Sequence, residues 1–175
     1  MKATEDKLLN TEQARRYTQE AMQPAEVVVH VTKFNNILIA EGPPAKRNTE
    51  NTMEMIDGKD HPRVRRHDGK LKIRPGGATI RFHLTPDDYY PIGISFMRMA
   101  DPSDPDAAEF TPTERLGTLN FGQVKICPVE HTLDVTDHFK DEEEDDQYKF
   151  SLIIQEAKTG AIGIIDPIIE HEGEN

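Results

Sequence analysis

The chain has one cysteine, no tryptophan and no long apolar run. Cys127 has no second thiol within the chain, so an intrachain disulfide is excluded, which is typical of proteins in a reducing compartment. The first ten residues contain no apolar core of a secretory signal, and no segment approaches the ~20 apolar residues of a membrane helix. We therefore expect a soluble, cytoplasmic protein without a membrane partner.

Positive charge is scarce relative to negative charge. The chain has 21 Lys and Arg residues and 32 Asp and Glu residues, which gives a formal net charge of −11. DNA and anionic membranes repel such a surface, so neither is expected as the main partner. Only 35% of the 175 residues are hydrophobic and 30% are charged, so we expect one domain whose core uses part of the chain.

The strongest pattern in the sequence lies near the carboxyl end. Apolar residues alternate with polar ones there, which predicts a strand with one buried face. Gly160 then occupies a hairpin-turn position, and the apolar segment 161–165 predicts a second strand that returns beside the first. Asp166-Pro167 should end this pairing, because proline has no amide hydrogen to donate. The alternating apolar residues are Tyr148, Phe150, Leu152 and Ile154.

Several further short strands are expected, with turn residues between them. Residues 41–70 show almost no periodicity, which indicates a long loop with a short strand at 53–56. Many short strands with hardly any helix are typical of an all-β, antiparallel sandwich. The other expected strands are 26–32, 34–40, 71–74, 78–84, 90–99, 118–121, 123–126 and 133–135.

A short N-terminal helix is predicted within an arm at residues 1–24. Residues 11–23 are rich in helix formers, and Pro24 ends the pattern. The apolar stripe of Ala14, Tyr17 and Ala21 is too thin for a core helix, so we expect the arm to dock loosely or to pack on another subunit. The sandwich domain should then span 25–169, followed by a polar tail at 170–175.

The carboxyl-terminal third resembles a small bacterial family of uncharacterised β-sandwich proteins called DP-EP. In that family an alternating aromatic and aliphatic strand is followed by a glycine turn and a short apolar strand that ends in Asp-Pro-x-Ile. The resemblance implies an immunoglobulin- or cupredoxin-like sandwich of bacterial type, and no known activity or site residue comes with it. The matching residues are Tyr148, Phe150, Leu152, Ile154, Gly160, Asp166, Pro167 and Ile168.

A basic segment at 59–74 interrupts the acidic chain. It could bind a phosphate, a nucleotide or the acidic run 141–146 of a neighbouring subunit, or it could be the solvent face of two short strands and a loop. Lys59 belongs to the segment as well. The candidate contact residues for an anion or a protein partner are Arg63, Arg65, Arg66, Lys70, Lys72 and Arg74.

Metal sites and catalytic groups are weakly indicated. The spacing Cys127-x3-His131, with His83 or His30 upstream, is the closest approach to a copper site, but no methionine follows in the same loop. The acidic loop 101–106 lacks the glycine and the final glutamate of a calcium loop. We therefore expect no catalytic residue, resident metal or cofactor.

Two classes of function remain open. The first hypothesis is a non-catalytic binding or assembly module whose partner is a protein, either a second copy or another chain. The alternative is a metal-, nucleotide- or phosphate-binding protein, or an enzyme, that uses the histidines or the basic segment 59–74. The small-molecule ligand is not identified by the sequence, and a carbohydrate-binding module is suggested only by analogy with other sandwiches.

Overall fold

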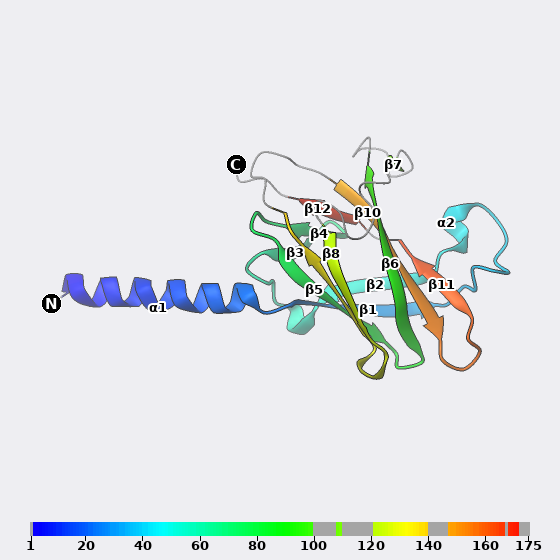
Figure 1. Ribbon diagram of the computed structural model, residues 1–175, viewed down its shortest axis with the longest axis horizontal. Coiled ribbons are helices and arrows are strands. Elements are labelled where there is room, and N and C mark those ends of the chain that lie inside the picture. Colours follow the sequence, from blue (N-terminus) through cyan, green and yellow to red (C-terminus); the bar gives the residue numbers. More distant parts are fainter. Residues whose placement is uncertain (1, 100–107, 110–120, 140–146, 167, 172–175) are drawn as a thin grey trace.

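The computed structural model describes residues 2–99, 108–109, 121–139, 147–166 and 168–171. Within them the chain forms two β-sheets and one long N-terminal helix, α1 (Lys2–Met22), with a short helix α2 (Pro44–Arg47) and two 3₁₀ turns, Ile56–Gly58 and Pro128–Glu130 (Figure 1). The strands are β1 (Ala25–Lys33), β2 (Glu50–Met55), β3 (Val64–His67), β4 (Lys70–Ile73), β5 (Ala78–Thr85), β6 (Tyr89–Met99), β7 (Ala108–Glu109), β8 (Phe121–Cys127), β9 (Thr132–Asp137), β10 (Gln147–Glu156), β11 (Ile162–Ile165) and β12 (Ile168–His171).

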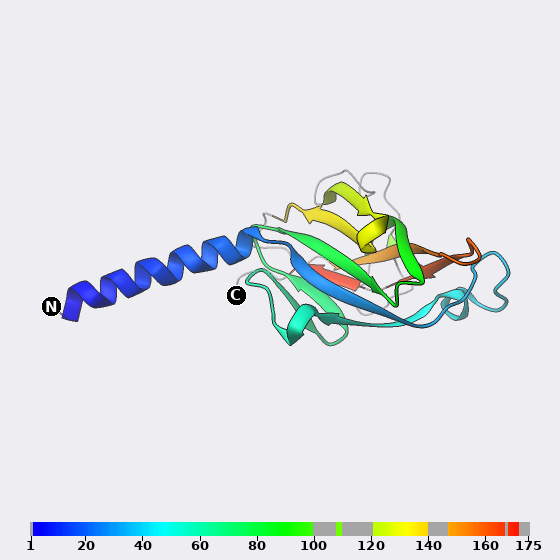
Figure 2. The same ribbon diagram turned by 90° about the horizontal axis from the view of Figure 1, so that it is seen from below.

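The strands form two layers, as the views from two sides show (Figures 1 and 2). One sheet has the order β2-β1-β5-β9-β8, and the other has the order β3-β4-β12-β10-β6-β7 with β11 paired to β10. The prediction of an all-β sandwich is confirmed. Its antiparallel character is not complete, because β1 pairs with β5 and β4 pairs with β12 in parallel.

Aromatic rings from both sheets meet in the core between the layers. Phe82 of β5 lies 5.3 Å from Phe150 of β10 between ring centroids, and Phe96 of β6 stacks on Phe121 of β8 at 3.8 Å. Tyr148 meets Phe121 edge to face. Because each aromatic ring buries a large apolar area, these contacts between the sheets contribute much of the stability of the fold.

The predicted carboxyl-terminal hairpin is confirmed. Phe150 and Leu152 of β10 are fully buried, and β10 pairs antiparallel with β11, which places Leu152 opposite Ile165. Gly160 has a φ of +72°, the left-handed conformation that glycine adopts without strain. On its other flank β10 pairs with β6 from Tyr148 to Glu156, so the hairpin is central in its sheet.

Two local predictions are wrong. Residues 34–40 form no strand: Leu38 and Ile39 are each 77% exposed, and the Leu38 amide donates to the Asn36 side chain in a turn. The short strand predicted at 53–56 corresponds to β2, but the rest of 41–70 is not one long loop, because it contains α2 and β3. Both errors arise because burial, and not apolar content alone, decides which segments become strands.

Smaller boundary differences occur at both ends of the chain. The helix starts at Lys2 and is therefore longer than the predicted 11–23, and β12 extends to His171, two residues into the predicted tail. The acidic segments 101–106 and 141–146 and the expected strand residues 118–120 lie outside the described residues.

Segment 34–49 covers the flank of β11 that faces away from β10. The amide of Ile37 donates to the carbonyl of Ile162, and the amide of Thr49 donates to that of Ile164, each at 2.8 Å. Gly163 lies between them, where a Cβ atom would come within 2.5 Å of the Thr49 hydroxyl. The close approach of the covering segment therefore requires glycine at this position.

Helix α1 projects from one end of the sandwich (Figures 1 and 2). All residues from 12 to 20 are exposed, and Ala21 is the first buried residue of the helix for which burial is described. In the described part of the chain, no helix is long and apolar enough to cross a membrane.

Candidate functional site

The joint between α1 and the sandwich is the best-defined polar site outside the sheets. The ring of His61 lies beneath the end of the helix, where its Nε2 donates to the carbonyl oxygens of Glu20 and Gln23, each at 3.0 Å. The last carbonyls of a helix lack the regular intrahelical donors, so His61 supplies one for the Gln23 carbonyl and a second one for the Glu20 carbonyl, which also accepts from the Gln23 amide at 3.2 Å. The hydroxyl of Tyr17 makes a longer contact of 3.5 Å with the Pro62 carbonyl.

The hydrogen bonds of His61 fix its tautomer. Its Nδ1 accepts from the amide of Arg63 at 3.2 Å, so Nδ1 carries no proton while Nε2 carries one. Burial lowers the pKa of His61 below its ordinary value; the Gln23 and Glu20 carbonyls and the Glu20 charge oppose this shift, and Arg63 adds to it. The ring that holds the helix is therefore neutral at neutral pH.

A cavity of about 520 Å³ opens beside this joint. Its volume lies in the range of small-molecule sites. The helix end and the sandwich both line it, so its shape depends on the direction of α1. Among its lining residues, the acids outnumber the basic side chains: the acids are Glu20, Glu26, Asp57 and Asp60, and the bases other than His61 are Lys59 and Arg81.

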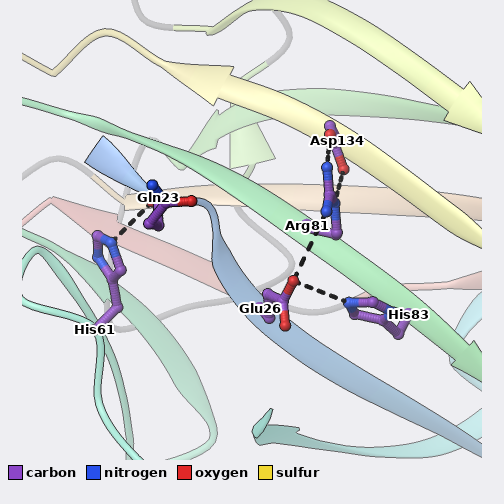
Figure 3. A network of polar contacts seen from close by, with 6 residues as sticks. All are labelled: Gln23, Glu26, His61, Arg81, His83 and Asp134. Atoms are coloured by element: carbon purple, nitrogen blue, oxygen red, sulfur yellow. Dashed lines mark hydrogen bonds and ion pairs between the residues drawn. The ribbon is translucent and has the colours of Figure 1, made fainter. Parts of the chain in front are cut away.

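A belt of charged residues crosses the outer face of the first sheet from the wall of this cavity (Figure 3). Arg81 of β5 lies opposite Asp134 of β9 and donates two hydrogen bonds to its carboxylate, at 2.7 and 2.8 Å. These bonds raise the pKa of Arg81 further above its ordinary value. The geometry is that of a cross-strand pair that stabilises the sheet.

Glu26 of β1 joins this belt through longer contacts. Its Oε1 lies 3.7 Å from Arg81 Nη1 and 3.7 Å from His83 Nε2, beyond hydrogen-bond distance in both cases. His83 Nε2 is itself buried without a hydrogen-bond partner in the structure. Glu26 and Arg81 therefore interact through their charges, and the three residues do not form a hydrogen-bonded catalytic triad.

The basic segment predicted as a contact site is divided by the fold. Arg65 and Lys72 are register partners on the outer face of the β3–β4 hairpin, whereas Arg66 lies opposite Leu71, on the face that carries the buried side chains. Lys70 also lies on the outer face, and Arg74 is exposed just past the end of β4. The structure thus brings Arg65, Lys70 and Lys72 to one face and separates Arg66 from them.

Arg63 has a structural role that the sequence did not indicate. Its guanidinium donates to the carbonyl oxygens of Gly76 and Gly77, at 2.9 and 3.2 Å. It therefore holds the turn between β4 and β5. An anion bound by this side chain would have to compete with these two bonds.

The residues of the suggested copper site do not come together. His83 and Cys127 lie on either side of Thr132, one on each neighbouring strand, so two strand spacings separate them. The side chain of His131 makes a different contact, in which its Nδ1 hydrogen-bonds to the carbonyl oxygen of Tyr89. Among the described residues, no three His, Cys, Asp or Glu side chains are grouped so that they could hold a metal ion.

Asp166, from the Asp-Pro step, anchors a second polar cluster. The Ser151 hydroxyl donates to its Oδ1, the Asn48 amide donates to its Oδ2 at 3.2 Å, and Lys149 Nζ lies 3.5 Å from Oδ2. Lys149 and Ser151 belong to β10, whereas Asn48 belongs to the covering segment 34–49. Asp166 therefore ties that segment to the sheet, which accounts for the residue structurally.

Sequence reasoning missed the residues that build the joint. Strand alternation could have placed Glu26, Arg81 and Asp134 on an outer face, because each is flanked by buried residues. No local signal points to His61, since its partners lie 38 and 41 residues away.

Comparison with known proteins assigns this chain to no family. No model of a known protein family matches the chain, and no curated protein sequence matches it significantly.

Proposed function

We propose that the protein is a non-catalytic assembly module that joins further copies of itself through α1. The observation that carries this proposal is the projection of a 21-residue helix whose side chains from 12 to 20 are all exposed. Helices in proteins gain most of their stability by packing an apolar face, and this helix packs only its end on the sandwich. A second helix would supply the missing packing along the stripe at Ala14 and Tyr17, which are exposed, whereas Ala21 is already buried in the single chain.

The charge distribution favours a second copy of the same helix as the partner. The excess of negative charge lies outside α1, because the helix carries equal numbers of acids and bases while the whole chain carries −11. Contact between helices therefore involves less repulsion than contact between sandwiches. The charged residues of the helix are Lys2, Glu5, Asp6, Lys7, Glu12, Arg15, Arg16 and Glu20.

Light scattering coupled to size-exclusion chromatography tests this proposal. We expect a mass above that of the 19.8 kDa chain, at low salt and at high salt alike. High salt screens the repulsion between the acidic sandwiches and leaves the apolar helix contact in place. A monomer at both salt concentrations would refute the proposal.

A matched pair of variants locates the contact. Tyr17→Glu places a charge on the apolar stripe and should reduce the mass to that of one chain. Gln19→Glu adds the same charge about 160° around the helix and should leave the mass unchanged. Equal effects of the two variants would mean that the stripe is not the contact surface.

Binding of a phosphate or a nucleotide at the basic segment is the second candidate. It is supported by Arg65, Lys70 and Lys72, which share the outer face of one hairpin. Thermal-shift measurements with inorganic phosphate and nucleotides test it, and assembly through this segment would weaken as salt rises. We rank it lower because the fold separates Arg66 and employs Arg63 in a turn.

The finer predictions from the sequence belong to the same proposal. They are a cytoplasmic location, which the single cysteine favours, and an immunoglobulin- or cupredoxin-like sandwich of the bacterial DP-EP type, which the residues of the carboxyl-terminal hairpin favour.

A further inference from the structure

His61 attaches α1 to the sandwich through hydrogen bonds that only its neutral ring can make together. Nε2 donates to the helix-end carbonyls of Glu20 and Gln23, while Nδ1 accepts from the amide of Arg63. A second proton on Nδ1 would point at the N–H of Arg63 and would remove the acceptor of that amide. The attachment of α1 therefore depends on the protonation state of one ring.

We propose that His61 is a proton-sensitive latch, which fixes the direction of α1 when neutral and releases it when protonated. The protonated ring leaves its half-buried position for solvent, because two donors would otherwise face each other at Nδ1. The Gln23 carbonyl then loses the donor that His61 supplied, and the Glu20 carbonyl keeps only the Gln23 amide. Another polar contact of the helix with this loop, from Tyr17 to the Pro62 carbonyl, is long at 3.5 Å.

Charged groups from each neighbouring element face this latch, and their signs oppose each other. The Glu20 charge of α1 favours a proton on His61, and the Arg63 charge disfavours it. The other charged residues that line the adjacent cavity are Glu26 of β1, Asp57, Lys59 and Asp60 of the turn before His61, and Arg81 of β5. Burial of the ring has the largest effect, and it lowers the pKa of His61.

The sign of the pH dependence follows from this lowered pKa. The attached ring binds a proton less tightly than the released ring, whose pKa is the ordinary 6.5. The latch is therefore complete above pH 6.5, and it weakens as the pH falls from 6.5 toward the lowered value. At about pH 5 a released ring with the ordinary pKa is almost fully protonated, so we expect the helix to lose its fixed direction as the pH falls toward this value.

The latch is a property of a single chain, and its effect on assembly rests on the proposed function. Copies joined through α1 would lose a common orientation when the helix swings freely. Acidification should then change the shape or the size of the assembly, whereas the latch itself should act equally in an isolated chain.

Spin-label distance measurements test the latch directly. Labels are placed on Gln13→Cys in α1 and Thr52→Cys in β2, both exposed, in a Cys127→Ser chain diluted with unlabelled chain. At neutral pH we expect one narrow distance peak, and at about pH 5 we expect that peak to be lost. Dilution restricts the measurement to distances within one chain, so its result does not depend on whether the protein assembles.

Three variants complete the test. His61→Gln keeps an N–H donor and cannot titrate, so its distance distribution should be the same at both pH values, and His61→Ala should lack the narrow peak at both. His30→Gln changes an exposed histidine that bonds to Glu54 and should respond to pH as the unchanged chain does. A wild-type peak that persists at pH 5, or a pH response retained in His61→Gln, would overturn the latch. Loss of the strand signal in circular dichroism at pH 5 would overturn it too, because release would then be global unfolding.

Discussion

The sandwich and the N-terminal helix of this chain are stabilised in different ways. In the sandwich, Phe82, Phe96 and Phe150 are almost completely buried between two sheets, whereas α1 exposes every residue from 12 to 20. A mutation in the first region removes many contacts within the chain, and a mutation in the second removes few. The comparison teaches that the stability of the sandwich and the exposed surface of the helix can be changed separately in this protein.

The largest expected effect is that of Phe150→Ala. The ring contacts Phe82 and Phe96 across the core, so its removal leaves a cavity and should cost about 3–5 kcal/mol of unfolding free energy. Urea unfolding followed by circular dichroism measures this loss. Val129→Ala is the control, because that apolar side chain is 89% exposed and its loss should cost less than about 0.5 kcal/mol.

A backbone substitution comes next. A Cβ atom at position 77 would lie 2.1 Å from the carbonyl oxygen of Asp137, and Gly77 has a φ of +63°. We expect Gly77→Ala to cost about 3 kcal/mol, from the clash and the strain together. Gly69→Ala is the matched control, with a φ of +76° but open space around it, and it should cost about 1 kcal/mol in the same unfolding assay. Equal costs would show that the contact with Asp137 is relaxed at little expense.

Asp166→Ala should have an intermediate effect. It leaves Ser151, Asn48 and Lys149 without their shared acceptor, at a cost of about 2 kcal/mol. It should also loosen segment 34–49, which hydrogen exchange of the Thr49 amide would detect. In Glu50→Ala, which breaks an exposed pair with Lys33, both quantities should change little. Unchanged exchange at Thr49 in Asp166→Ala would show that this carboxylate does not hold the segment.

The smallest effect on stability is expected in the helix. Tyr17 is 50% exposed, so Tyr17→Ala should change the unfolding free energy of the sandwich by no more than about 0.5 kcal/mol. Under the proposed function the same variant should weaken assembly, measured by light scattering. A loss of stability comparable to that of Phe150→Ala would remove the distinction between the two regions.

The parts of the fold that could be predicted are those with a regular local pattern. The alternation through Phe150 and Leu152 predicted β10, and Gly160 predicted the turn before β11, because a strand with one buried face repeats every two residues. The same rule predicted β5, where Ile80, Phe82 and Leu84 are all buried.

The parts that could not be predicted depend on distant partners. Only the end of β2 was predicted, at 53–56, because its sequence alternates only at Met53 and Met55; residues 50–52 join the strand because β1 offers them a paired edge. The parallel pairings of β1 with β5 and of β4 with β12 depend on how distant strands meet in the sheets, which local periodicity does not encode.

The candidate site was predicted less well than the fold. The basic segment was visible as composition, but only the register of β3 and β4 showed that Arg65 and Lys72 share a face from which Arg66 is excluded. No sequence pattern indicated the role of His61, because its ring bonds to backbone carbonyls, which every residue has.

The segment that covers β11 has a consequence for the behaviour of the protein in concentrated solution. Unsatisfied carbonyls along a strand are a template on which foreign strands add, and such addition leads to aggregates. The carbonyls of Ile162 and Ile164 are already occupied by the chain itself, so this flank of the sheet is closed to an incoming strand. A cut in the exposed turn at Leu38 and Ile39 should loosen this cover and make the flank of β11 more accessible to another strand.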